Sequence, residues 1–98
     1  MKDFTEISNI INSYLRKYEP EEIGIFGSYA RNESKENSDI DILVSFKKTV
    51  TLIDLAHIRN ELSEVLNIKV DLVTKRSLHP KILPFIEKDL RIIYQQIQ

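Results

Sequence analysis

The spacing of apolar residues changes several times along the chain, and each change predicts where one kind of element replaces another. Between residues 4 and 18 apolar side chains recur every three or four positions, as on one face of an amphipathic helix. Short β-branched and aromatic runs at residues 23–26 and 40–46 predict two strands. A short helical turn from Ser28 and a solvated loop are expected between these strands.

The middle of the chain returns to helical spacing. Thr51 followed by Asp54 has the pattern of a capping box, and Asn67 is a residue type that often ends a helix. The inward stripe of this helix is expected to consist of five aliphatic residues, Leu52, Leu55, Ile58, Leu62 and Val65.

The last third of the chain predicts a strand, a helix and a second strand. Apolar and polar residues alternate at 69–74, which is typical of a strand. Residues 78–88 are expected to form a helix with Pro80 in its first turn. Residues 90–94 fit either a helical extension or an edge strand, and we favour the strand. The element order predicts an α+β fold, a small mixed β-sheet packed with helices.

Length and composition limit the classes of protein to consider. The 98 residues are enough for one domain, spanning 1–98, and the 42% hydrophobic and 30% charged content is that of a globular protein. A net charge of −1 provides no overall positive field for nucleic acid. No apolar stretch approaches the ~20 residues needed to cross a membrane. We therefore expect a cytoplasmic protein without a nucleic-acid or membrane partner.

Two aspartates at the start of the second strand are the most informative local feature. Asp39 and Asp41 are separated by one residue, so in an extended chain they project from the same face, roughly 6.5 Å apart. Such closely spaced carboxylates repel each other, and a divalent cation such as Mg²⁺ would offset the repulsion. Two aspartates on an exposed edge strand, present as a defence against aggregation, are the alternative.

A third aspartate occurs on the next predicted strand. Asp71 would complete a cluster with the first two if the strands are neighbours; otherwise it is a solvated strand residue. Three carboxylates can hold two metal ions that clamp the attacking and leaving oxygens of a nucleotidyl transfer. In such a site Asp71 would be placed to act as general base.

Three further features near the aspartates are candidate phosphate contacts. Gly27 and Ser28 follow a strand, where free N–H groups can face an anion, although the pair also suits an ordinary turn and helix cap. Arg31 could contact a triphosphate oxygen or pair with Glu33. Ser38 could contact phosphate, and we favour a turn residue at the entry to the strand.

Three segments together resemble a known family. The segments GSYAR at residues 27–31, SDIDILV at 38–44 and VDLVT at 70–74 are similar to those of the minimal nucleotidyltransferase domains of the DNA polymerase β superfamily. The resemblance covers essentially the whole chain. It implies the nucleotidyltransferase fold and catalysis with two Mg²⁺ ions and ATP as substrate.

The resemblance also implies a role for each motif residue. The nucleotide phosphates would be held at Gly27 and Ser28, and the metal ions by Asp39, Asp41 and Asp71.

The resemblance further implies a partner and an acceptor. Minimal nucleotidyltransferases of this family are paired with helical HEPN-family RNase toxins, so we expect an antitoxin that forms an oligomeric complex with its toxin and transfers AMP to a tyrosine of it. Two alternatives remain open. The acceptor could be a small hydroxyl compound resembling an aminoglycoside, or the domain could neutralise its partner by binding without catalysis.

Overall fold

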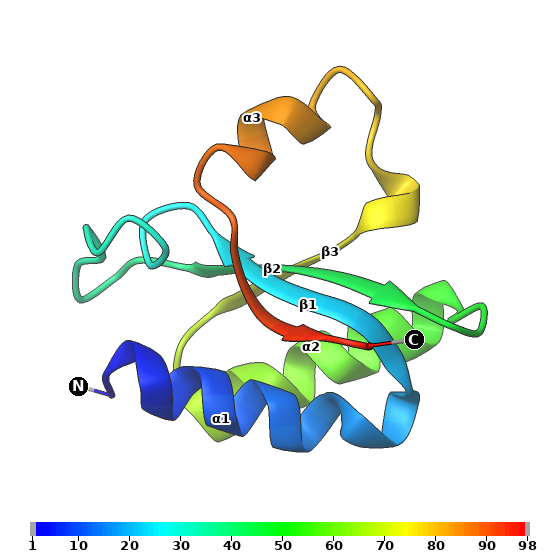
Figure 1. The fold of residues 1–98 in the computed structure, drawn as a ribbon. Coiled ribbons are helices and arrows are strands. Elements are labelled where there is room, and N and C mark those ends of the chain that lie inside the picture. The colour runs from blue at the N-terminus through cyan, green and yellow to red at the C-terminus, as the bar shows by residue number, and fades with distance from the viewer. Residues whose placement is uncertain (1, 98) are drawn as a thin grey trace.

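The computed structural model describes residues 2–97, which build a four-stranded mixed sheet with helices (Figure 1). The strand order is β3-β2-β1-β4. β1 (Pro20–Phe26) is antiparallel to both β2 (Ile40–Phe46) and β4 (Arg91–Gln95), whereas β3 (Val70–Thr74) runs parallel to β2. The α+β fold expected from the sequence is confirmed, as is the strand at the end of the chain.

Two long helices cover one face of the sheet, and a short helix lies on the other side. α1 (Phe4–Leu15) and α2 (Leu52–Leu66) lie side by side below the sheet in Figure 1, and α3 (Leu83–Glu87) lies above it. The first helix was expected to extend to residue 18. It ends at Leu15 and continues as one 3₁₀ turn, Arg16–Tyr18.

The hydrophobic core lies between the sheet and the two long helices. On β2 the side chains of Ile40, Ile42 and Val44 are fully buried in it, as the alternation of the strand predicts. The fully buried core residues from the other elements are Ile7, Ile11, Leu15, Ile23, Ile25, Ile58, Leu62 and Leu66. Because the even-numbered residues of β2 face this core, its odd-numbered residues face the side on which α3 lies.

The helix α2 begins and ends as predicted, but its inward stripe differs. Thr51 and Asp54 form the capping box, and Asn67 ends the helix with a φ of 55°. Ile58 and Leu62 are buried, and Leu66 continues the row at four-residue spacing. The expected members Leu52 and Val65 are wrong, since their side chains are 84% and 51% exposed. Val65 lies about 100° around the helix from Leu66 and so points away from the core.

The helix predicted at residues 78–88 is largely wrong. A 3₁₀ turn, Lys75–Ser77, follows β3. Within the predicted range, only α3 is regular α-helix. Proline disfavours helical backbone at the residue before it and removes an N–H donor. Pro80 therefore interrupts the expected helix, and Pro84 occupies the first turn of the shorter one.

The turn after β1 has one hydrogen bond of α-helical type, but the short helix expected from Ser28 does not form. Residues 27–32 form hydrogen-bonded turns without regular helix. The N–H of Arg31 donates to the carbonyl of Gly27, and that of Glu33 donates to Ser28. Asn32, with a φ of 59°, redirects the chain before a helix can develop.

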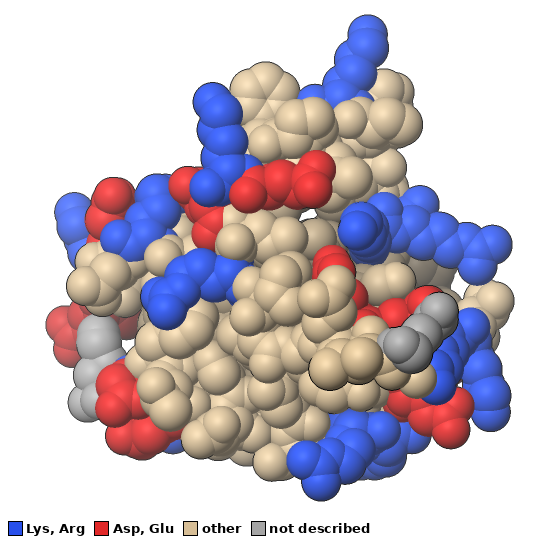
Figure 2. All heavy atoms as spheres, viewed as in Figure 1, with Lys and Arg blue, Asp and Glu red and all other residues tan. Residues whose placement is uncertain are grey.

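Charge is distributed without a dominant sign on the face of the molecule seen in Figure 2. Acidic and basic side chains are interspersed there, with large uncharged areas between them. None of the helices described in residues 2–97 has the length and apolar content that a membrane crossing requires.

Candidate functional site

Two of the three predicted aspartates are direct neighbours across the sheet. Asp41 of β2 and Asp71 of β3 occupy the same position in the parallel pairing of these strands. Ile40 and Ile42, on either side of Asp41, face the helices, so the carboxylate of Asp41 faces the opposite side. The structure therefore brings Asp41 and Asp71 together on the face of the sheet that α1 and α2 leave uncovered.

The carboxylate of Asp41 is crowded by like charge. Partial burial is the largest cause that raises its pKa from 3.8 to about 6, and the charges of Asp71 and then Asp39 raise it further. The positive charge of Arg31 acts in the opposite direction but is the smallest of these effects. A bound cation would offset this repulsion and would therefore favour the ionised form of the carboxyl group.

Asp39 lies nearby but has a different environment. It precedes the first residue of β2, is exposed, and has Lys69 Nζ 3.9 Å from its Oδ2. Its charge still reaches Asp41, since it contributes to the raised pKa of that residue. As its side chain stands, Asp39 is partly neutralised by Lys69.

Gly27 lies directly against the Asp41 carboxylate. Its φ of +75° is in the left-handed region that favours glycine, and a Cβ at this position would overlap Oδ2 of Asp41. Glycine is therefore required here for two reasons, the backbone conformation and the space that the carboxylate occupies. The Gly27-Ser28 turn and the aspartates form one site.

The turn offers unused backbone donors. Along the turn from Gly27, Arg31 is the first residue whose N–H donates to a backbone carbonyl. The N–H groups of Ser28, Tyr29 and Ala30 have no backbone acceptor within residues 2–97. Consecutive free N–H groups in a turn can bind an anion without a helix dipole. The local geometry thus suits a phosphate, although the helix N-terminus considered from the sequence is not formed.

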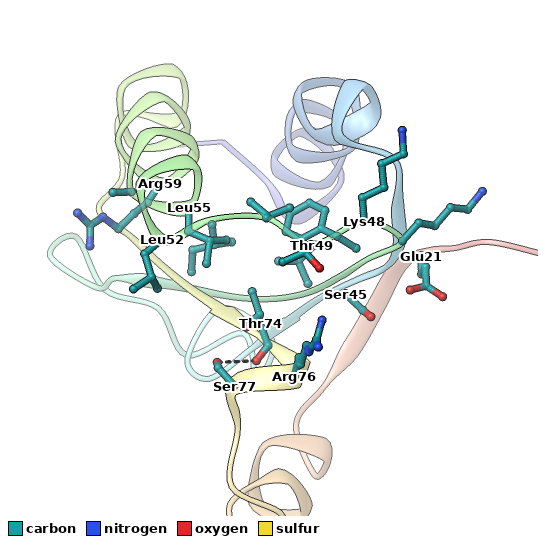
Figure 3. Close-up of a pocket in the computed structure, with 16 residues that line it drawn as sticks. Glu21, Ser45, Lys48, Thr49, Leu52, Leu55, Arg59, Thr74, Arg76 and Ser77 are labelled. Atoms are coloured by element: carbon teal, nitrogen blue, oxygen red, sulfur yellow. Dashed lines mark hydrogen bonds between the residues drawn. The ribbon is translucent and has the colours of Figure 1, made fainter.

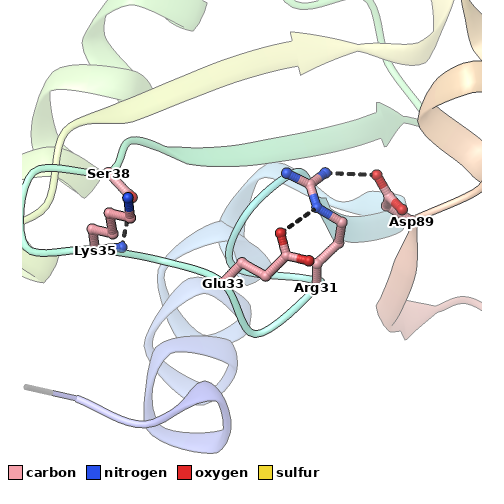
Figure 4. Close-up of polar contacts among 5 residues, drawn as sticks. All are labelled: Arg31, Glu33, Lys35, Ser38 and Asp89. Atoms are coloured by element: carbon pink, nitrogen blue, oxygen red, sulfur yellow. Dashed lines mark hydrogen bonds and ion pairs between the residues drawn. The ribbon is translucent and has the colours of Figure 1, made fainter.

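Arg31 is held by two carboxylates (Figure 4). Its Nη1 is 2.8 Å from Oδ2 of Asp89, and its Nε is 3.4 Å from Oε2 of Glu33. The hydrogen bond to Asp89 is the largest cause that raises the pKa of Arg31, followed by that to Glu33. The salt bridge to Glu33, left open by the sequence, is present. The contact with Asp89 also ties the turn to the chain that follows α3.

Ser38 is a turn residue in this structure. Its Oγ accepts a hydrogen bond from the N–H of Lys35 at 2.7 Å, and its own N–H donates to the carbonyl of Lys35 (Figure 4). This agrees with the turn favoured from the sequence. A contact between Ser38 and phosphate stays a prediction.

The donor set suits Mg²⁺ in one particular mode. Within residues 2–97, no three His, Cys, Asp or Glu side chains converge closely enough to hold a metal ion by themselves. Mg²⁺ is commonly bound by one or two carboxylates together with substrate phosphates and waters. The adjacent carboxylates of Asp41 and Asp71 fit that mode. The role of Asp39 as a third ligand stays a prediction.

Sequence reasoning missed Asp89 as a residue of this region. It lies 58 positions from Arg31, at the end of a segment that was expected to be helical and that has little regular structure. The segment returns to the sheet at β4, which pairs with β1 directly after Leu90. No local sequence pattern indicates this contact.

Comparison with known families gives a match over most of the chain. The sequence model described as nucleotidyltransferase domain matches residues 7–93. A Methanocaldococcus jannaschii protein, named as a candidate protein adenylyltransferase, is 46% identical over 95 residues. That alignment covers 92% of this chain and 97% of the relative.

Solved structures agree with the sequence match. A crystal structure of a toxin-antitoxin with AMP-PNP superimposes with a TM-score of 0.84 at 28% identity, covering 91% of this chain and 73% of that chain. A complex of tri-AMPylated Shewanella oneidensis HEPN toxin with an MNT antitoxin gives a TM-score of 0.78 at 26% identity. It covers 94% of this chain and 72% of the other.

Proposed function

Because this chain belongs to the nucleotidyltransferase domain family, we propose that it is an antitoxin that transfers AMP from ATP to a tyrosine of a HEPN-family toxin. The observation that carries the proposal is the placement of Asp41 and Asp71 side by side next to the Gly27-Ser28 turn. The similarity to an AMPylated HEPN toxin's antitoxin supports the acceptor class. The tyrosine is implied by the resemblance found in the sequence.

The proposed nucleotide position follows from the free donors of the turn. The N–H groups of Ser28, Tyr29 and Ala30, together with the Ser28 hydroxyl, would bind the phosphates of ATP. Mg²⁺, held by Asp41 and Asp71 with Asp39 as a further ligand, would neutralise the phosphates and polarise the reacting phosphorus. Arg31 would add a positive charge beside the triphosphate, because its guanidinium already lies close to Asp41.

The proposed reaction is a single in-line displacement. The tyrosyl oxygen of the partner attacks the α-phosphorus of ATP, the bond from that phosphorus to the bridging oxygen breaks, and pyrophosphate leaves. The exposed carboxylate of Asp71 accepts the phenolic proton. Residues of the chain therefore position the nucleotide and accept one proton, and the partner supplies the nucleophile.

Intact-mass measurement of the HEPN protein co-expressed with this chain tests the proposal. We expect the partner to gain one or more AMP groups, located on tyrosine by fragment spectra. A chain with both Asp41→Asn and Asp71→Asn should leave the partner unmodified. Glu64→Gln, which removes an exposed carboxylate on α2, is the matched control and should behave as the parent chain.

Other acceptors are separated in the same assay. Labelled ATP incubated with both proteins and with aminoglycosides shows whether label enters a protein or a small molecule. Label found only in a small hydroxyl compound would refute the toxin as acceptor. Full neutralisation of the toxin by the Asp41→Asn, Asp71→Asn chain would refute the requirement for catalysis.

A further inference from the structure

A second concave surface lies at the opposite end of β2 and β3 from the aspartates. This cleft has a volume of about 720 Å³ and lies between the first half of α2 and the ends of the two strands (Figure 3). Leu52 and Leu55 come from α2, and Thr74 and Ser77 lie across from them. Its volume is within the range of ~300–1,000 Å³ that is typical of binding sites.

The cleft is separate from the aspartate site. Its sheet residues include Val44 and Leu72, which share a face with the core residues Ile42 and Val70. Asp41 and Asp71 are at alternate positions and point to the other face. A molecule bound in the cleft would therefore leave the nucleotide site free.

The rim of the cleft is basic in a chain whose net charge is −1. Lys47, Lys48, Arg59 and Arg76 line it, with Glu21 as its acidic member. Lys48 is 3.7 Å from Glu19, but the other three cations form no ion pair within residues 2–97. The charge of the rim is thus complementary to an acidic occupant.

The apolar surface continues beyond the cleft. Leu52 and Ile53, in the first turn of α2, have side chains that are 84% and 82% exposed. Exposed neighbouring aliphatic residues of this kind commonly mark an interaction surface. Leu52 lines the cleft and Ile53 does not, so an occupant that covers both must extend beyond the cleft, which favours a macromolecule over a small ligand.

We propose that this cleft is the docking site for an acidic amphipathic helix of a partner protein. The aliphatic residues of the helix would cover Leu52, Ile53 and Leu55, and its carboxylates would pair with Arg59 and Arg76. RNA fits less well, because single-stranded RNA is bound by exposed aromatic rings and Phe46, half-buried, is the only aromatic residue of the lining. The identity of the partner as the HEPN toxin rests on the function proposed above.

A peptide titration tests the cleft without any assumption about the toxin. The ¹⁵N-labelled full chain is mixed with a synthetic helical peptide that has leucine at positions i, i+3, i+4 and i+7 and glutamate elsewhere. Amide shifts are expected at residues 52–59 and 74–77, and not at residues 27–31 or 41. The same peptide with lysine in place of glutamate should cause none of these shifts.

Charge reversal sharpens the test. Arg59→Glu combined with Arg76→Glu should weaken acidic-peptide binding at least about tenfold and allow the lysine peptide to bind. Lys17→Glu combined with Lys35→Glu, which reverses two exposed cations elsewhere, should leave binding unchanged. An amide spectrum that is unchanged away from the substituted residues confirms that each variant folds. Equal binding of both peptides, shifts outside the cleft, or preferential binding of a single-stranded RNA would overturn the proposal.

The HEPN toxin provides a separate measurement. Affinity for the toxin should fall at least about tenfold in the Arg59→Glu, Arg76→Glu chain, and should be unaffected in the Lys17→Glu, Lys35→Glu chain. Unchanged affinity in the charge-reversed chain would exclude the cleft as the docking site for this toxin. A toxin that binds through the cleft and is never adenylylated would refute the proposed function and leave the docking site standing.

Discussion

The two ends of the β2–β3 pair carry opposite charge on opposite faces of the sheet. At the start of the strands, Asp41 and Asp71 are adjacent and the pKa of Asp41 is raised to about 6. At the far end, Arg59 and Arg76 border a cleft of mixed polar and apolar lining on the helix side. Each end concentrates one sign of charge that the chain neutralises only in part. The first end is suited to bind a cation with a nucleotide, and the second an acidic protein.

The two ends also differ in what is unfavourable in the free chain: repulsion between carboxylates at one end, and exposed aliphatic side chains at the other. The aspartate end places two repelling carboxylates side by side, which costs free energy in the absence of a ligand. The cleft end has ordinary backbone and exposes Leu52 and Ile53 to solvent. Substitutions at the first end should therefore change both stability and catalysis, whereas those at the second should change mainly association.

The largest effect is expected from Asp41→Asn. Loss of this ligand should reduce the rate of AMP transfer by about 10²–10³-fold, in the range found when one electrostatic contact to the reacting group is removed. The rate is measured with labelled ATP and the HEPN partner. Arg59→Gln, at the other end of the strands, should transfer AMP normally at saturating partner. A rate in Asp41→Asn within a few fold of the parent would remove Asp41 from the site.

Gly27→Ala should have the next largest effect, on folding. A left-handed conformation costs an alanine roughly 1–2 kcal/mol, and overlap with Asp41 adds to this cost, so we expect about 2 kcal/mol of destabilisation in urea unfolding. Gly24→Ala is the matched control, since its new Cβ meets the end of the flexible Leu90 side chain. If the two alanines prove equally costly, the contact between Gly27 and the carboxylate is unimportant.

The pH dependence of stability isolates the repulsion at Asp41. Because folding raises the pKa of Asp41 from 3.8 to about 6, its contribution is most favourable below about pH 4 and is lost as the pH rises to about 6. Asp41→Asn should therefore be more stable than the parent at pH 7.5 by about 1–2 kcal/mol, less than the full shift because the carboxyl is partly solvated. At pH 4 the difference should nearly disappear. Denaturant unfolding at both pH values measures it, and a less stable Asp41→Asn at pH 7.5 would contradict the repulsion.

The smallest effect is expected from Asp89→Asn. Weakening the 2.8 Å contact with Arg31 should loosen the chain around α3, because this ion pair joins that segment to the turn after β1. Hydrogen exchange at residues 83–90 should become modestly faster, with no change in α2. Glu87→Gln is the control on the same segment. Identical exchange in both variants would show that the ion pair does not restrain α3.

Local patterns in the sequence were sufficient for the strands and for the face on which Asp41 lies. Alternation placed Ile40 and Ile42 in the core, and this fixed the face of Asp41. The pairing with Asp71 stayed conditional in the sequence, because no local pattern shows which strands are neighbours; the structure pairs them. Short-range rules work here because each strand is specified by its own residues.

Contacts between distant segments were beyond those rules. Pro80 and Pro84 shortened the last helix, and the position of the remaining segment depends on Asp89 meeting Arg31 across 58 residues. In α2 the predicted Ile58 and Leu62 are buried, but the row continues four residues on to Leu66 and not three residues on to Val65. The cleft escaped notice because its basic residues come from the strand ends and a helix, and no short motif contains them.

The most direct test of the central claim is paramagnetic broadening by Mn²⁺ with AMP-PNP in the ¹⁵N spectrum of the full chain. If Asp41, Asp71 and the Gly27-Ser28 turn form the nucleotide site, broadening centres on residues 27–30, 41 and 71 and leaves residues 52–59 sharp. It is lost in Asp41→Asn. Broadening centred elsewhere, or unchanged by Asp41→Asn, would contradict the assignment of these carboxylates and the adjoining turn as the nucleotide site.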